Sequence, residues 1–148
     1  MRIVFAAFLL LAARSVHAGD GTFEVATTGA SGTVGDKASA SVTIKAKKGW
    51  HLNHEAPLSL KLSPVPGVAM DKPKLGRKDL ALTSETEARF DVGFTLSEPG
   101  KKVVEGEAGF VLCREDACRP IREKLTIATE ATAAKAAPAP AKKPRKKK

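Results

Sequence analysis

The chain has 148 residues, with 25 basic and 16 acidic residues and a formal net charge of +9. Seven of the basic residues lie at positions 131–148 and two lie before position 19, so the remaining 16 balance the acids. Because positions 19–130 are formally neutral, the charge argues against nucleic-acid binding as the main function. These 112 residues suffice for one domain with one hydrophobic core.

The first 18 residues have the pattern of a secretory signal peptide. Arg2 precedes the apolar run Ile3–Ala13, which is shorter than the roughly 20 residues that span a bilayer. Val16 and Ala18 occupy the two positions that a signal peptidase reads, which predicts cleavage after Ala18. We therefore expect a periplasmic or secreted protein, in an oxidising compartment where a disulfide is the default state of a cysteine pair.

Seven segments have the composition or the period-two alternation of short strands, and Gly- and Pro-rich turns separate them. They are 23–26, 38–46, 58–62, 68–70, 88–96, 103–113 and 121–128. Gly106 and Gly109 suggest a bend or bulge in the sixth, and we expect a break in register near Arg122 in the seventh. No segment between 19 and 130 sustains a helical period. The predicted fold class is therefore all-β, an antiparallel β-sandwich.

The segments between these strands are expected to be loops. Gly19–Gly35 is rich in Gly, Ser and Thr, and only 23–26 within it is expected to form a strand. Asp71–Thr83 contains a proline, a glycine and several charges, and is expected to be exposed. Trp50 is the only tryptophan, and we expect it in the core because sandwiches commonly bury one.

The C-terminal segment 131–148 has no large apolar residue, so we expect a disordered tail. Its basic cluster, Lys142–Lys148, permits two interpretations. The first is a solubilising tail with no specific partner. The second is attachment to an anionic membrane or envelope polymer, at about 1 kcal/mol per basic residue near a charged surface.

Cys113 and Cys118 are the only cysteines, and four residues separate them. One ends a predicted strand and the other begins the next, so a hairpin would bring the two sulfurs within bonding range. A bridge that closes so short a loop stabilises the fold by roughly 2 kcal/mol, and a longer loop would contribute more. This favours a redox role, with an inert structural bridge as the alternative. Arg114 and Arg119 would favour the reactive thiolate, and the two acidic residues of the loop would oppose it.

The segments Lys48–Asn53 and Phe110–Pro120, the second with its cysteine pair followed closely by proline, give the chain a resemblance to a known family. It resembles the amino-terminal periplasmic domain of the thiol:disulfide interchange protein DsbD, over about residues 42–128. The resemblance implies an immunoglobulin-like sandwich in which Cys113 and Cys118 are the catalytic pair, a reversible dithiol/disulfide. It also implies thioredoxin-like partners, here on separate chains in the envelope. The segment 71–80, which corresponds to the loop that caps the cysteines in that family, has no Phe or Tyr.

Neither a metal site nor a cofactor is predicted. His51 and His54 are three residues apart, which on a strand directs them to opposite faces, so one is expected beside Trp50 and the other on the surface. No Ser-His-Asp pattern and no phosphate-binding loop is visible. The alternative function is a non-catalytic immunoglobulin-like binding module with a structural disulfide, tethered to an anionic envelope surface by its basic tail.

Overall fold

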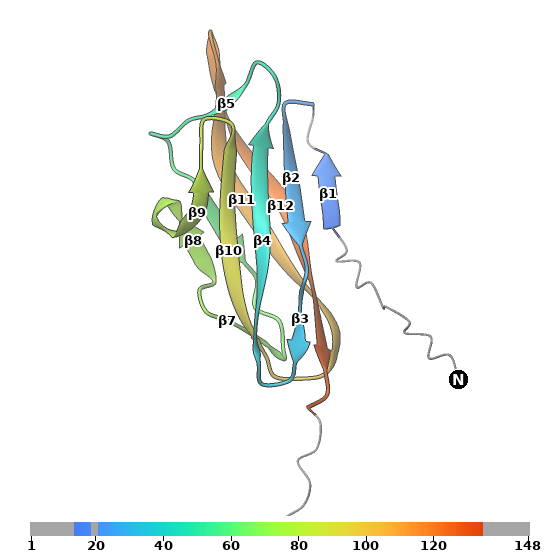
Figure 1. Ribbon diagram of the computed structural model, residues 1–148. Coiled ribbons are helices and arrows are strands. Elements are labelled where there is room, and N and C mark those ends of the chain that lie inside the picture. Colours follow the sequence, from blue (N-terminus) through green and yellow to red (C-terminus); the bar gives the residue numbers. More distant parts are fainter. Residues whose placement is uncertain (1–13, 19–20, 135–148) are drawn as a thin grey trace, which may run out of the picture.

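The computed structural model describes the backbone of residues 14–18 and all atoms of residues 21–134. Two β-sheets pack face to face, which confirms the all-β sandwich (Figure 1). The elements in chain order are β1 (Arg14–Ala18), β2 (Phe23–Thr28), β3 (Ala30–Thr33), β4 (Lys37–Ala46), β5 (His51–Leu52), β6 (Ser59–Leu62), β7 (Val68–Met70), β8 (Lys74–Gly76), the 3-10 turn η1 (Arg77–Asp79), β9 (Leu80–Thr83), β10 (Glu87–Leu96), β11 (Gly100–Arg114) and β12 (Ala117–Thr132).

The first sheet has the strand order β1-β2-β4-β10-β7, and β9 also pairs with β10. All of its pairs are antiparallel, and β4 and β10 run together from Glu87↔Lys45 to Thr95↔Lys37. Strict alternation on β10 predicted this strand, and its inward side chains are all buried. They are Ala88, Phe90, Val92, Phe94 and Leu96.

The second sheet has the order β3-β12-β11-β6-β8, and β5 pairs with β11. The pair β3–β12 is parallel and the others are antiparallel. The register of β11 and β12 continues unbroken from Gly100↔Ala131 to Arg114↔Ala117, so the bulge expected near Arg122 is wrong. Positions 121, 123, 125 and 127 all face inward, and a half-buried Glu123 occupies the place that appeared to break the pattern.

β11 has a glycine at position 106 because its neighbours pack too closely for a side chain, and the strand has no bulge there. Gly106 lies opposite Leu62 of β6 and Leu125 of β12. A Cβ atom on Gly106 would lie 2.8 Å from Leu62 Cδ2 and 3.0 Å from the carbonyl oxygen of Lys61. The missing side chain therefore lets the two neighbouring leucines close over the strand.

The core joins the two sheets through large side chains. Phe23 of β2 and Phe110 of β11 stack edge to face, with ring centroids 5.2 Å apart. Both are buried, and edge-to-face pairs stabilise a core beyond the area they bury. This contact anchors the half of β11 that leads to the cysteines.

Several predicted loops contain structure. Segment 71–83 was expected to be an exposed loop, and it forms β8, η1 and β9. Segment 19–35 contributes β3 and a longer β2 than expected. These short strands escaped prediction because few of their residues alternate; β8, for example, buries only Leu75.

The two ends of the chain lie partly outside the described residues. The last strand continues to Thr132 with Ala131 buried, so the predicted tail begins later than position 131. Residues 14–18 of the predicted signal peptide form β1, which pairs with β2. The rest of both predictions, residues 1–13 and 135–148, lies outside the described residues, and the signal peptide and disordered tail stay predictions. In the described part, no helix is long and apolar enough to cross a membrane.

Candidate functional site

The cysteine pair lies at the end of the β11–β12 hairpin, which Figure 1 shows extending past the rest of the sandwich near β5. Cys113 and Cys118 are directly opposite each other, with Cα atoms 4.0 Å apart, and form a disulfide. β11 ends one residue later than the predicted segment 103–113, and β12 begins four residues before the predicted segment 121–128, so the connecting turn is Glu115–Asp116 alone. The pairing of the two strands therefore places the two cysteines side by side.

The two cysteines differ in their exposure to solvent. Cys113 is only 4% exposed, because β5 pairs with β11 on its other side and places His51 beside it. Cys118 is exposed. In the described part of the chain, its strand β12 meets β3 only at Thr129–Thr132, far from the cysteine. Of the two cysteines, Cys118 is therefore the one that is open to solvent.

Asn53 provides the polar contact to the buried sulfur. Its side-chain nitrogen Nδ2 donates to Cys113 Sγ at 3.6 Å. Its oxygen Oδ1 accepts from the backbone N–H groups of Glu55 at 2.9 Å and Ala56 at 3.2 Å. These two donors fix the oxygen, so the amide nitrogen must face the sulfur. A donor at this position favours a thiolate on Cys113 over a thiol.

The segment that carries Asn53, directly after β5, is hydrogen-bonded to both sheets. The N–H of Asn53 donates to the Val111 carbonyl at 2.9 Å in the second sheet. The N–H of Leu52 donates to the Glu85 carbonyl at 2.7 Å, in the turn between β9 and β10 of the first sheet. The backbone of the residue that donates to the Cys113 sulfur is thus held by hydrogen bonds to both sheets.

A cavity of about 510 Å³ opens beside the disulfide. Its lining combines both sulfur-bearing residues with polar and titratable groups, namely His51, Leu52, Asn53, His54, Glu85, Cys113, Arg114 and Cys118. The chain turns after Asn53, which brings both histidines to this cavity, and both are exposed. The prediction that one histidine would pack beside Trp50 is therefore wrong. The described residues contain no group of three His, Cys, Asp or Glu side chains arranged to hold a metal.

The guanidinium groups of Arg114 and Arg119 lie over the ring of Trp50. Arg114 directly follows Cys113 and Arg119 directly follows Cys118 on paired strands, so strand alternation directs both arginine side chains to the face opposite the cysteine side chains. Their guanidinium carbons lie 5.3 and 5.6 Å from the centre of the Trp50 ring. Trp50 is half-buried at the edge of the core, contrary to the expectation of a core position. The arginines bind the ring by cation–π contacts. The side-chain donor to Cys113 Sγ is Asn53.

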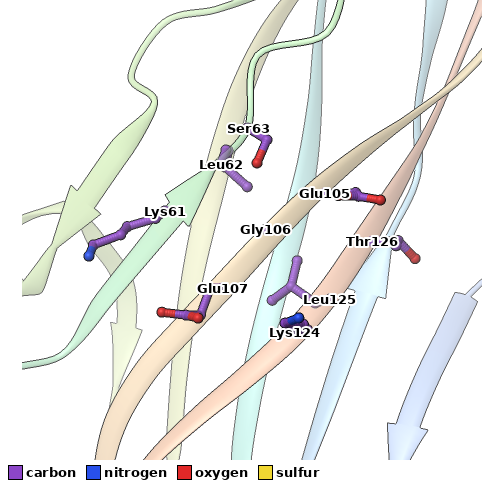
Figure 2. Close-up of a pocket in the computed structure, with 9 residues that line it drawn as sticks. All are labelled: Lys61, Leu62, Ser63, Glu105, Gly106, Glu107, Lys124, Leu125 and Thr126. Atoms are coloured by element: carbon purple, nitrogen blue, oxygen red, sulfur yellow. The ribbon is translucent and has the colours of Figure 1, made fainter.

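A larger cavity, of about 670 Å³, lies elsewhere on the second sheet (Figure 2). Lys61 and Lys124 are the cross-strand neighbours of Glu107 there, with Gly106 next along β11. The lining has no thiol and no histidine. Its charges are those of a solvated sheet face, whereas the smaller cavity is the one lined by the two cysteines.

The sequence predicted the cysteine pair, and the structure joins it. It did not predict Asn53 or Glu85, whose backbones are connected to the site by hydrogen bonds with Val111 and Leu52. The one available signal for Asn53 was local: an asparagine that directly follows an apolar strand residue is typical of a turn closed by its own side chain.

No family model matches the sequence, and no curated protein matches it. Among solved structures, the chain is similar to the N-terminal periplasmic domain of ScsB from Proteus mirabilis, with a TM-score of 0.51 and 12% identity over 79% of this chain. The match covers 51% of that structure, so the chain spans about half its length. A second similarity is to AggA, the major subunit of aggregative adherence fimbriae type I from Escherichia coli, with a TM-score of 0.42 and 14% identity over 81% of this chain and 96% of that one. At such identity the first likeness shows a shared fold.

Proposed function

We propose that this chain is an exported thiol–disulfide exchange module in which Cys113 and Cys118 form a reversible disulfide. The observation that carries the proposal is the asymmetry of the pair. Cys118 is an exposed residue, and Cys113 is a buried residue whose sulfur accepts from a hydrogen-bond donor. A purely structural bridge needs neither feature, whereas exchange needs both an attackable sulfur and a stabilised leaving group.

The exchange reaction proceeds in two steps. A thiolate of a partner dithiol attacks Cys118 Sγ, the Cys113–Cys118 bond breaks, and a mixed disulfide forms between Cys118 and the partner. Cys113 leaves as a thiolate beside Asn53 Nδ2 and takes up a proton from solvent. The second thiol of the partner then attacks its own sulfur in the mixed disulfide and releases Cys118. Two electrons and two protons pass from the partner dithiol to this chain, and the reverse sequence passes them on.

Three observations support export and the choice of partner. The N-terminal 18 residues have a signal-peptide pattern. The fold is similar to that of a periplasmic domain. The segments 48–53 and 110–120 resemble the periplasmic domain of DsbD, which points to thioredoxin-like proteins on separate chains as the partners. The basic cluster 142–148 would hold such a module near an anionic envelope surface.

Reduction by a thioredoxin-like protein tests this function. We expect the oxidised chain, mixed with a thioredoxin-like dithiol protein at micromolar concentration, to gain two alkylatable thiols by mass spectrometry, and to do so at least about tenfold faster than with dithiothreitol at equal thiol concentration. The variant with both cysteines changed to serine is the blank. A folded chain that stays oxidised, while the urea-unfolded chain is reduced, would contradict the proposal.

A further inference from the structure

We propose that Arg77 is a positioning residue for the disulfide: it fixes the turn that holds Asn53 Nδ2 on Cys113 Sγ, and so controls how readily Cys113 is released as a thiolate. The inference deepens the proposed exchange function and rests on it for its biological meaning. It depends on a series of contacts that leads from Arg77, through the turn at residues 53–56, to Cys113 Sγ.

The first link is between Arg77 and the turn. Arg77 Nη2 donates to the carbonyl oxygen of Asn53 at 3.4 Å and also to the carbonyl oxygen of Ala56. These carbonyls lie at the two ends of the turn that the Asn53 side chain closes from inside. The arginine therefore closes the same turn from outside, and a guanidinium is suited to bridge two fixed oxygens.

The second link is between the turn and the sulfur. Asn53 uses its backbone N–H on Val111, its carbonyl on Arg77, and its Oδ1 on two backbone donors. The only group left to adjust is Nδ2, which donates to Cys113 Sγ at 3.6 Å. Sulfur is a weak acceptor, so this contact depends on the turn to hold the amide in place. If the turn loosens, the amide can find water instead.

Arg77 lies in a segment that is held in place by strand pairing and side-chain hydrogen bonds. It begins η1, directly after β8, which pairs with β6. Asp79 Oδ2 accepts from the Gly76 N–H at 3.0 Å, and Asp79 Oδ1 accepts from Lys72 Nζ at 2.5 Å. The hydrogen bond from Lys72, followed by that from Gly76, holds the pKa of Asp79 below its ordinary value of 3.8, so this carboxylate is ionised near neutral pH.

The position of the segment 71–80, which contains Arg77, shows how Arg77 acts on the disulfide. None of the described residues 71–80 lines the cavity beside the disulfide. The segment therefore acts indirectly: Arg77 fixes the turn at residues 53–56, and Asn53 of that turn contacts the sulfur. This distinguishes a positioning role for Arg77 from direct contact with either cysteine.

A double-mutant cycle in the full-length chain tests the coupling. The chain and its Arg77→Gln, Asn53→Ala and double variants are equilibrated with reduced and oxidised glutathione, and the reduced fraction is measured by alkylation. We expect each single change to shift the equilibrium about tenfold toward the disulfide, the scale of one hydrogen bond to a charged group. The double variant should shift no further than Asn53→Ala alone, because Arg77 acts through Asn53.

Two variants separate this coupling from charge and from misfolding. Arg89→Gln removes the same charge from a partly buried arginine of the first sheet that pairs with Asp91, and should leave the equilibrium unchanged. Arg77→Met keeps the aliphatic length, removes the donors, and should reproduce the Arg77→Gln shift if that variant folds poorly. A shift from either Arg77 change that persists in full in the Asn53→Ala background would overturn the inference, as would no shift at all. Glutathione needs no protein partner, so the coupling can still be measured if the exchange reaction with a thioredoxin-like protein fails. Conversely, a double-mutant cycle with no shifts would overturn the role of Arg77 without contradicting the exchange reaction.

Discussion

Replacing Cys113 with serine should turn the protein into a trap for the disulfide form of a partner, whereas replacing Cys118 should not. In Cys113→Ser the remaining thiol is the exposed one, and it can form a stable mixed disulfide because no neighbouring thiol resolves it. In Cys118→Ser the remaining thiol is 4% exposed beneath β5 and reacts only when the site opens locally. A local opening free energy of about 2.7 kcal/mol would make it about 100-fold slower.

The two variants are each other's control, because each keeps one thiol and each differs from the parent chain by one sulfur replaced with oxygen. The measurement is the rate of modification by an aromatic disulfide reagent, followed by absorbance and confirmed by mass. Urea should abolish the difference, because the unfolded chains expose both positions. Equal rates in the folded proteins, or faster reaction of Cys113, would show that the asymmetry of burial does not govern the chemistry.

Truncating Phe110 should produce the largest loss of stability among the changes considered. Phe110→Ala removes a buried ring from the edge-to-face pair with Phe23 and leaves a cavity between the two sheets. Such changes cost about 3–5 kcal/mol, a large share of the stability of a small domain. Urea unfolding of the oxidised protein, followed by the fluorescence of Trp50, measures the difference in free energy of unfolding.

Two controls accompany this variant. Phe110→Leu keeps an apolar side chain at the position and should cost less than Phe110→Ala. Val103→Ala changes the same strand where the side chain is 56% exposed, and should stay within about 0.5 kcal/mol of the parent. A cost for Phe110→Ala below about 1.5 kcal/mol would mean that this contact does not hold the two sheets together.

The fold was predictable where one strand carries a full alternation of its own. Strand β10 has five inward apolar residues in sequence, and the predicted segment 88–96 matches it within one residue. β8 buries one residue and β9 buries none, so their pairing depends on β6 and β10 rather than on local pattern. β3 joins the second sheet through a parallel pairing with β12, a contact across about 100 residues that no local signal reveals.

The candidate site divides in the same way. Two cysteines separated by four residues between two strand patterns predicted the bridge from the sequence alone. The difference between the two sulfurs was not predictable, because it arises from β5 pairing with β11 beside Cys113. The direction of Arg114 and Arg119 was missed because their role was judged from proximity along the chain, whereas strand alternation directs them to Trp50.

The reduction potential of the Cys113–Cys118 pair, measured in the full-length folded chain against a graded redox buffer, tests the central claim most directly. A disulfide that opens and closes during exchange should lie above about −300 mV, within the reach of thioredoxin-like dithiols. A value well below about −300 mV would contradict this account and indicate a permanent staple in a sandwich that binds its partner by other means.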